Sequence, residues 1–219
     1  MRRSLLSLIS VLLLVGCSPD EKAIDLPAPK RTGARALEEV LAKRRTTRDF
    51  GPGTLGRSHI GQLLWAAQGI ADQRGQRTCP SAGGLYPLEI YVATRDGVAH
   101  YVPRGHKLET VSTKDVRAAL HKASKKQDAI RDAPAIFVIT AVPARTRKKY
   151  GARTTRYVHM EAGHAAQNLL LQATALGLVG APVGAFRDRD VQRALGCAMD
   201  HEPLYLVPIG RPRKPIWGN

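Results

Sequence analysis

Apolar residues recur along the chain at the spacing of an α-helix in several stretches. These stretches predict helices over residues 34–45, 59–69, 114–126, 158–178 and 187–195. In the first of them, Leu37, Val40 and Leu41 share one face, which we expect to be buried. The longest stretch, 158–178, has apolar or small side chains on most sides and predicts a nearly buried central helix.

Other apolar runs have the composition of strands. Residues 88–94 and 98–102 flank the turn signal Asp96-Gly97 and predict a β-hairpin. Residues 135–142 form a continuous apolar run rich in β-branched side chains, which predicts a central buried strand, and residues 204–209 predict a last strand. The order of these elements predicts an α+β fold in which a small, mostly antiparallel sheet is packed by helices.

Two loops between these elements are rich in proline and glycine. Residues 77–87 have the sequence R-T-C-P-S-A-G-G-L-Y-P, and residues 180–186 have the sequence G-A-P-V-G-A-F. Glycine permits positive φ and close approach to the backbone, so such a loop can present main-chain groups to a flat or charged partner. An ordinary surface loop is the simpler interpretation of either stretch alone.

The N-terminal residues have the pattern of an export signal. Residues 1–16 carry two arginines and an apolar run too short for a comfortable membrane span, which predicts a signal peptide. The run ends in L-V-G-C, which resembles a bacterial lipobox, so we expect Cys17 to be acylated and to anchor the protein to a membrane of the bacterial cell envelope. A plain secretory peptide or an unprocessed N-terminal anchor is the alternative. Residues 17–33 lack a hydrophobic period and predict a flexible tether before one globular domain over residues 34–219.

Charge and cysteine content narrow the classes of partner. The formal net charge is +16, which usually indicates nucleic acid, anionic lipid or phosphorylated ligands. No helix-turn-helix, zinc-finger or RNP-type pattern occurs, so we expect no nucleic-acid partner. Cys17, Cys79 and Cys197 form neither a disulfide framework nor a zinc-ligand pattern. His159 and His164 would lie about 140° apart around a helix, so we predict no metal site there.

A basic, hydroxyl-bearing cluster ends the first predicted helix at residues 44–48. Guanidinium groups and hydroxyls suit a phosphate, although such a cluster is more often a solvated face. A second basic group follows the last predicted strand, at residues 211–214. Together with the two glycine-proline loops, these groups would fit a ligand that has a phosphate at one end and a flat apolar ring at the other.

The order of these motifs resembles that of a known family. The segments R-R-T-T-R-D-F, L-L-W-A-A-Q-G and R-T-C-P-S-A-G-G-L-Y-P-L-E-I-Y follow one another as in the FMN-dependent nitroreductase superfamily, and more narrowly as in the SagB/ThcOx-type dehydrogenases. The resemblance continues through K-Y-G-A-R-T-T-R-Y, P-V-G-A-F and L-V-P-I-G-R-P and covers residues 36–213. Each motif is weak alone, but their joint order is specific.

The resemblance implies a nitroreductase-like fold and an FMN site shared across a homodimer interface. The residues that match the phosphate and ribityl segment are Arg44, Arg45, Thr46 and Arg48. The residues that match the loop along the isoalloxazine ring are Pro80, Ser81, Ala82 and Gly83. The residues that match the loop whose backbone N–H faces flavin N5 are Val183, Gly184 and Ala185. Arg211 and Arg213 match a C-terminal phosphate clamp, and a main-chain donor at N5 with a cation near the phosphate are usual means of tuning a flavin.

The resemblance also implies a catalytic pair. In SagB-like azoline dehydrogenases a Lys-Tyr pair serves proton removal, and Lys149-Tyr150 matches it. Hydride would leave to N5 while a base takes the neighbouring proton. Arg145, Arg147, Lys148 and Arg153 crowd Lys149 in the sequence, and like charges favour a neutral amine. The alternative is that Lys149 is one more surface cation.

The predicted export sets this chain apart from the biosynthetic members of that family, which work in the cytoplasm with a cyclase and a peptide-recognition partner. We therefore expect the broader function, an FMN oxidoreductase that acts on a small or peptidic substrate. Two alternatives remain open. The chain would be a membrane-tethered flavin-binding protein without turnover, or a basic lipoprotein that binds anionic polymers.

Overall fold

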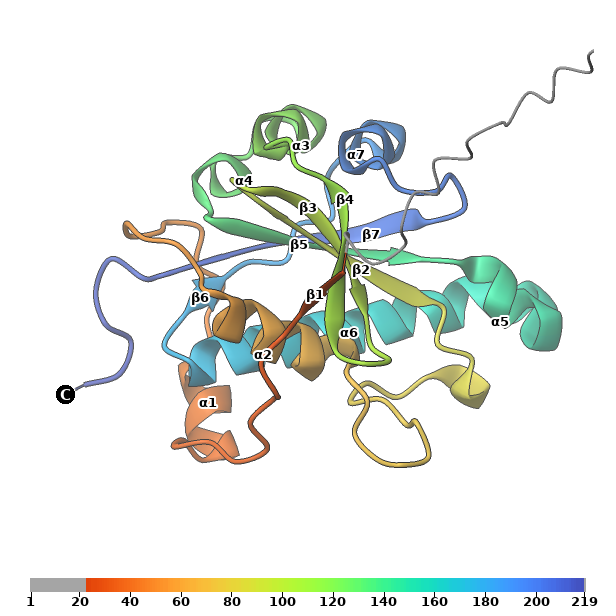
Figure 1. Cartoon of the computed structure of the whole chain (residues 1–219), viewed down its shortest axis with the longest axis horizontal. Helices are drawn as coiled ribbons and strands as arrows, with labels where there is room; N and C mark the ends of the chain where they lie inside the picture. Colours follow the sequence, from red (N-terminus) through yellow and green to blue (C-terminus); the bar gives the residue numbers. More distant parts are fainter. Residues whose placement is uncertain (1–22, 219) are drawn as a thin grey trace, which may run out of the picture.

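The computed structural model describes residues 23–218, which form one seven-stranded sheet with helices on both faces (Figure 1). The strands are β1 (Ala23–Asp25), β2 (Leu88–Thr94), β3 (Gly97–Val102), β4 (Lys107–Ser112), β5 (Ala135–Ala141), β6 (Val179–Gly180) and β7 (Glu202–Gly210). The helices are α1 (Leu37–Lys43), α2 (Arg57–Gln68), α3 (Arg117–Ala123), α4 (Asp128–Asp132), α5 (Pro143–Tyr150), α6 (Thr154–Ala175) and α7 (Asp188–Leu195). The strand order is β1-β4-β3-β2-β5-β7-β6, and neighbouring strands pair antiparallel.

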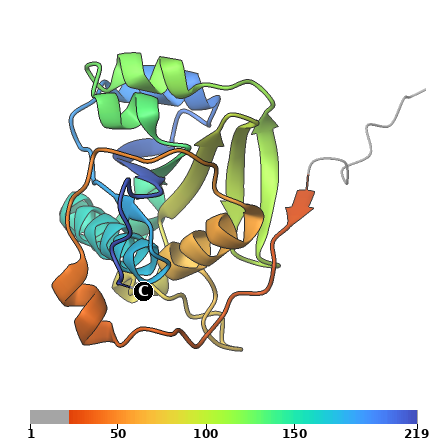
Figure 2. The ribbon, with the colours of Figure 1, turned by 90° about the vertical axis from the view of Figure 1, so that its left-hand side faces the viewer.

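The sheet is built on β5, in which every residue is buried between β2 and β7. Side chains of successive strand residues point to opposite faces, so one run of apolar residues supplies two cores. Phe137 and Ile139 pack with residues of α2 and α6 on one face. Ile136 and Val138 pack with residues of α3, α4 and α7 on the other. Figure 2 shows these two helical layers above and below the sheet. The predicted α+β fold with a mostly antiparallel sheet is confirmed.

The predicted central helix is α6, and other elements lie at each of its two ends. It begins at Thr154, four residues before the predicted start, and its 22 residues include a buried face with Val158, Ala162 and Leu169. The opposite face of α6 is open and includes Met160, which is 55 % exposed. Figure 1 shows α5 at one end of α6 and α1 at the other.

The prediction for α1 was wrong in one respect. Only Val40 of its apolar residues is buried, whereas Leu37 is 59 % exposed and Leu41 is 49 % exposed. The helix lies at the margin of the domain, so only one line of its side chains meets the core. Two large apolar side chains are therefore left on the surface beside the open face of α6.

The predicted tether also differs from the structure where the two overlap. Residues 23–25 form the edge strand β1, which pairs with β4, and Leu26 is buried. The Lys30 N–H donates to Gln62 Oε1 on α2 at 2.8 Å. An edge strand is stabilised by main-chain hydrogen bonds and needs little apolar periodicity, so composition alone did not reveal it. The predicted signal peptide and Cys17 lie outside the described residues.

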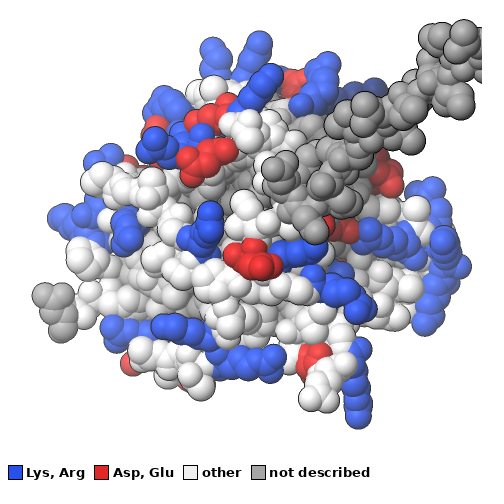
Figure 3. Space-filling view, in the orientation of Figure 1, with Lys and Arg blue, Asp and Glu red and all other residues white. Residues whose placement is uncertain are grey.

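The surface is basic on the face drawn in Figure 3, where lysine and arginine side chains are spread widely rather than gathered in one stripe. This distribution fits the solvated basic surface that the net charge of +16 requires. Within residues 23–218, no helix combines the length and the apolar character that a bilayer span would need.

Candidate functional site

The segment after α1 lies against the C-terminal strands of the sheet. Thr46 forms a β-bridge with Gly180, and the Thr47 N–H donates to the Gly180 carbonyl at 3.0 Å. The Gly51 N–H donates to the Arg211 carbonyl at 2.8 Å. Residues 44–51, β6 and the chain after β7 are therefore neighbours, although they are far apart in the sequence. We call this group the arginine half-site.

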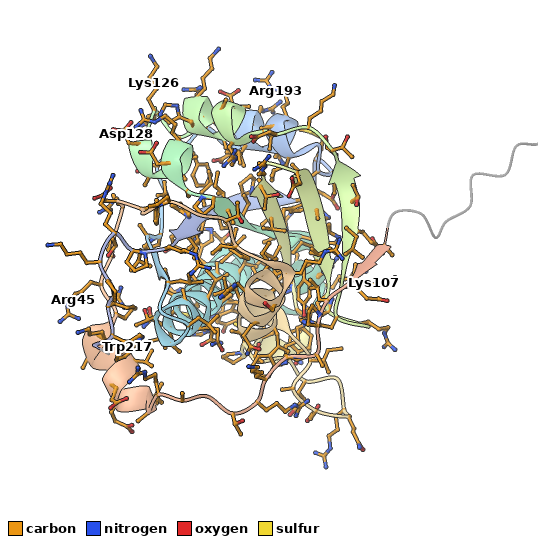
Figure 4. All side chains as sticks on the ribbon, turned by 60° about the vertical axis from the view of Figure 1, so that its left-hand side comes forward. Arg45, Lys107, Lys126, Asp128, Arg193 and Trp217 are labelled. Carbon is orange, nitrogen blue, oxygen red and sulfur yellow. The ribbon has the colours of Figure 1, made fainter. Side chains whose placement is uncertain are left out.

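The predicted basic residues of the arginine half-site have different surroundings. Within the described part of the chain, Arg44, Arg48 and Arg211 form no ion pair and no side-chain hydrogen bond. Arg45 Nη1 instead donates to the carbonyls of Ala42 and Arg44, and Figure 4 shows its side chain pointing away from the sheet. Arg213 pairs with Asp49 at 2.7 Å, and both side chains are exposed. Three guanidinium groups are thus left for an anion.

The loop after β6 continues along β7 from this basic group. Val183 and Leu206 exchange two main-chain hydrogen bonds of 2.9 Å, and the Ala185 carbonyl accepts from Gln127 Nε2 at 3.0 Å. Between these anchors Gly184 is exposed, and no heavy atom lies within 4 Å of the position that a Cβ would take. Three residues of extended chain from Gly180 to Val183 span about 10 Å. The loop therefore presents free backbone about that far from the basic group.

The loop at residues 80–84 belongs to a second group. Ser81 Oγ donates to Glu161 Oε2 of α6 at 2.6 Å and accepts from the Tyr86 N–H at 2.9 Å. The short 3₁₀ helix η2 (Ala82–Gly84) follows, with φ of 64° at both Gly83 and Gly84. This left-handed backbone requires glycine in practice, and it turns the loop over the end of α6. Pro80, Gly83 and Gly84 are exposed there.

Lys149 and Tyr150 lie directly against this loop. A Cβ added to Gly83 would be 2.9 Å from Tyr150 Oη and 3.1 Å from Lys149 Nζ. Tyr150 also packs edge-on against Tyr157 of α6, with ring centroids 4.9 Å apart. The structure thus brings together Lys149, Tyr150 and the Pro80–Gly83 loop, which the sequence places about 70 residues apart. We call this group the glycine half-site.

The two half-sites do not meet within one chain. The glycine half-site contacts α6 at Glu161, whereas the arginine half-site lies along its C-terminal turns, where a Cβ on Gly180 would be 3.3 Å from Leu170 Cδ2. The nine residues from Glu161 to Leu170 span about 14 Å at 1.5 Å per residue. Within residues 23–218, no hydrogen bond or ion pair joins the two half-sites.

Sequence reasoning missed a charged network around the glycine half-site. Arg145 Nη2 pairs with Glu89 at 2.5 Å, and His100 Nε2 lies 2.7 Å from the other carboxyl oxygen. Burial would raise the pKa of Glu89, but hydrogen bonds from His100 and Arg145 outweigh it and hold that pKa below its usual value. The Arg145 guanidinium is therefore paired with the Glu89 carboxylate, a partner that the sequence did not reveal. Arg145 Nη1 also donates to the Tyr86 carbonyl at 3.1 Å and fixes one end of the loop.

Glu161 is the second group that the sequence analysis did not assign. Burial raises its pKa to about 7, while the Ser81 hydrogen bond and the Arg77 charge act in the opposite direction. Beside it, burial raises the pKa of the Cys79 thiol to about 12, so Cys79 is a neutral, packed side chain. The sequence carried one signal for this role, because Glu161 lies on a face of the predicted helix that is otherwise lined by alanine and leucine. Residues 23–218 contain no group of three or more His, Cys, Asp or Glu that could hold a metal ion.

The chain is similar in sequence to proteins that are named as nitroreductases. The sequence model described as the nitroreductase family matches residues 41–211. A Methanocaldococcus jannaschii relative named as a nitroreductase, MJ1384, is 44 % identical over 181 residues, which cover 80 % of this chain and 90 % of the relative.

Solved structures give the same result. A Ralstonia eutropha JMP134 protein titled as a nitroreductase superposes with a TM-score of 0.81 and 30 % identity, over 90 % of this chain and 92 % of that one. A chain of the Escherichia coli microcin synthetase McbBCD complex superposes with a TM-score of 0.68 over 95 % of this chain and 85 % of that one. At 22 % identity that second likeness shows the fold alone. On the family match and the relative at 44 % identity, this chain belongs to the nitroreductase family of oxidoreductases.

Proposed function

We propose that this protein is an FMN-dependent oxidoreductase that acts as a homodimer and moves hydride between flavin N5 and a small or peptidic substrate. The observation that carries the proposal is the placement of two complementary half-sites at separate positions along α6. One half-site offers three unpaired guanidinium groups, and the other offers a glycine loop with a Lys-Tyr pair. Neither is sufficient alone for a ligand that has both a phosphate and a ring.

The residues of the two half-sites fit FMN in kind. Arg44, Arg48 and Arg211 would hold the phosphate, because guanidinium groups make paired, charge-assisted hydrogen bonds to it. The exposed backbone at Gly184 has open space in front of it and could donate an N–H to the edge of the ring. Bound FMN would supply the hydride chemistry, and the protein would supply orientation and a proton-transfer group.

A two-fold dimer about the open face of α6 would complete both sites. If α6 packs antiparallel against its copy, the glycine half-site of one protomer comes to the end of α6 where its partner carries the arginine half-site. Exposed Leu37, Leu41 and Met160 flank that face and would be buried by such a contact. A closed two-fold interface is also the commonest form of homo-oligomer.

The Lys149-Tyr150 pair favours a dehydrogenase of the SagB type over simple reduction of a nitro group. Both polar ends lie at Gly83, on the loop that matches the ring-binding segment. A base at that place could take a proton from a substrate carbon or heteroatom next to the one that loses hydride.

Subunit complementation tests the shared site. The double variant Arg44→Ala/Arg211→Ala damages only the arginine half-site, and Gly83→Val damages only the glycine half-site. We expect each purified variant to bind little FMN. Co-expression should give about half heterodimers, each with one intact site of two, and so about a quarter of the wild-type flavin content per chain.

The control is an equal mixture of the two variants that were expressed and purified separately. If co-expressed protein holds no more flavin than this mixture, the site is not shared between protomers. If the wild-type protein takes up no FMN at all, the proposed function itself is wrong.

We also propose that Cys17 carries a lipid that holds the domain at a membrane of the cell envelope. The support is the lipobox-like ending of the apolar segment. Cys17→Ser is expected to move the protein from the membrane fraction to the soluble fraction of its host, measured by immunoblot. Cys197→Ser removes a free thiol elsewhere and should leave the fractionation unchanged. Equal membrane association of both variants would contradict the lipid anchor.

A further inference from the structure

Glu161 is a buried carboxyl group whose hydrogen-bonding capacity is half used. The residue is 3 % exposed, and its Oε2 accepts the Ser81 hydroxyl at 2.6 Å. Its Oε1 is buried and has no hydrogen-bond partner among the described residues. Buried polar atoms are nearly always partnered, so an unpartnered carboxyl oxygen under a loop calls for a functional explanation.

The groups that face Glu161 do not supply a counter-ion in direct contact. Arg77 lies near it, but its guanidinium stacks on the Tyr86 ring at 4.7 Å and donates to Gln68 Oε1 at 2.8 Å. Gln68 Nε2 comes close enough to lower the pKa of Glu161, yet it forms no hydrogen bond in the structure. The Cys79 thiol points to the Glu161 main-chain carbonyl at 3.6 Å. An unpaired, buried carboxyl favours its neutral form, which is why its pKa rises to about 7.

The Ser81 hydroxyl has one hydrogen and two acceptor lone pairs. The Tyr86 N–H uses one lone pair, and an ionised Glu161 takes the hydrogen. A protonated Glu161 can instead donate its own hydrogen to Ser81 Oγ. The hydrogen of Ser81 is then released, and Ser81 is partly exposed on the loop that matches the ring-binding segment.

We infer that Glu161 is a positioning residue whose protonation decides whether the Ser81 hydroxyl donates inward to the carboxyl or outward to the ring of a flavin bound on the loop. This inference rests on the proposed FMN function and deepens it by assigning a proton-linked donor in the glycine half-site. A flavin that accepts from Ser81 favours the protonated acid. By linkage, affinity for the flavin is highest below pH 7 and falls as the pH rises through 7, where the free carboxyl ionises.

The test is the dissociation constant of FMN, measured by quenching of flavin fluorescence between about pH 5.5 and about pH 8.5 in wild-type protein, Glu161→Gln and Ser81→Ala. Glutamine has the shape of the neutral acid and cannot ionise, so Glu161→Gln should keep the low-pH affinity throughout. For each protein we take the ratio of the dissociation constant at about pH 8.5 to that at about pH 5.5. Dividing the wild-type ratio by the Glu161→Gln ratio removes the effects of titrating the FMN phosphate and other side chains. We expect a remaining factor of about ten, the value of one hydrogen bond.

Ser81→Ala is the second arm and does not depend on how well Glu161→Gln folds. It should bind FMN with the weaker, high-pH affinity and should show no pH dependence beyond that of Glu161→Gln. Thermal unfolding of each variant at pH 6 checks the fold. The inference is overturned if Glu161→Gln or Ser81→Ala keeps the full pH dependence of the wild type. It is also overturned, together with the proposed function, if wild-type protein binds no FMN at any pH, and these two failures are readily told apart.

Discussion

Gly180→Ala is expected to destabilise the domain and to weaken FMN binding at least about a hundredfold. A Cβ at this position would lie 2.8 Å from the Pro208 carbonyl oxygen and 3.0 Å from Ile209 Cγ1. On its other side the same residue holds Thr46 and Thr47 through a β-bridge and a hydrogen bond. The methyl group would therefore push β6 from β7 and carry residues 44–48 away from Arg211.

The size of this effect follows from two sources. Overpacking a well-filled site costs about 1–3 kcal/mol of stability, and urea unfolding of the variant would measure this cost. Loss of two hydrogen bonds to a charged phosphate, each worth about 1.5–3 kcal/mol, accounts for the loss of affinity. Gly184→Ala is the matched control for stability, because it adds the same methyl group in the same loop with no atom within 4 Å. The free energy of unfolding of Gly184→Ala should lie within about 0.5 kcal/mol of the wild-type value. Wild-type stability and FMN affinity in Gly180→Ala would show that β6 is not the support of the phosphate end.

Lys149→Ala is expected to lower the rate of substrate oxidation about 100- to 10,000-fold and to leave the FMN content unchanged. Removal of a positioned proton acceptor has an effect of that size. The measurement is the rate at which an azoline-containing substrate, of the kind that SagB-like dehydrogenases oxidise, bleaches bound FMN under anaerobic conditions. Tyr150→Phe keeps the packing against Tyr157 and removes only the hydroxyl near Gly83. A rate below that of the wild type in this variant would therefore assign the Tyr150 hydroxyl to proton transfer.

Lys148→Ala provides the control for charge. It removes the same charge from the adjacent position of α5, where the side chain is exposed. Its rate should stay within about twofold of the wild type, as for a surface substitution. Equal rates in the two lysine variants would make Lys149 an ordinary surface cation. If no donor bleaches bound FMN even in the wild type, the alternative of a flavin-binding protein without turnover is favoured.

The sequence predicted the parts of the fold that are defined by apolar runs. The strand at residues 88–94 was predicted to the residue, and the strand at 135–142 was one residue too long. The edge strand β1 and its neighbour β4 were missed, because main-chain hydrogen bonds hold them in the sheet and most of their side chains are not buried. The exposed side of α1 was also missed, since periodicity identifies an apolar face but not what covers it.

The candidate site divides in the same way. Residue types and their order identified both groups of ligand-facing residues through a family resemblance. Their distribution between two ends of α6 became visible only in three dimensions. The contact between Ser81 and Glu161 joins residues 80 positions apart, and no local pattern encodes such a contact. The role of Arg145 changed for the same reason, because its partner Glu89 lies on another element.

The pairing of β1 with β4 has a consequence for where the enzyme can work. Ala23, the first described residue of β1, follows Cys17 by six residues in the sequence. Even a fully stretched chain of that length reaches only about 20 Å. A lipid on Cys17 would therefore hold the domain close to the bilayer, with its β1 side facing the membrane. Catalysis would then be confined to molecules that pass within a few nanometres of the membrane.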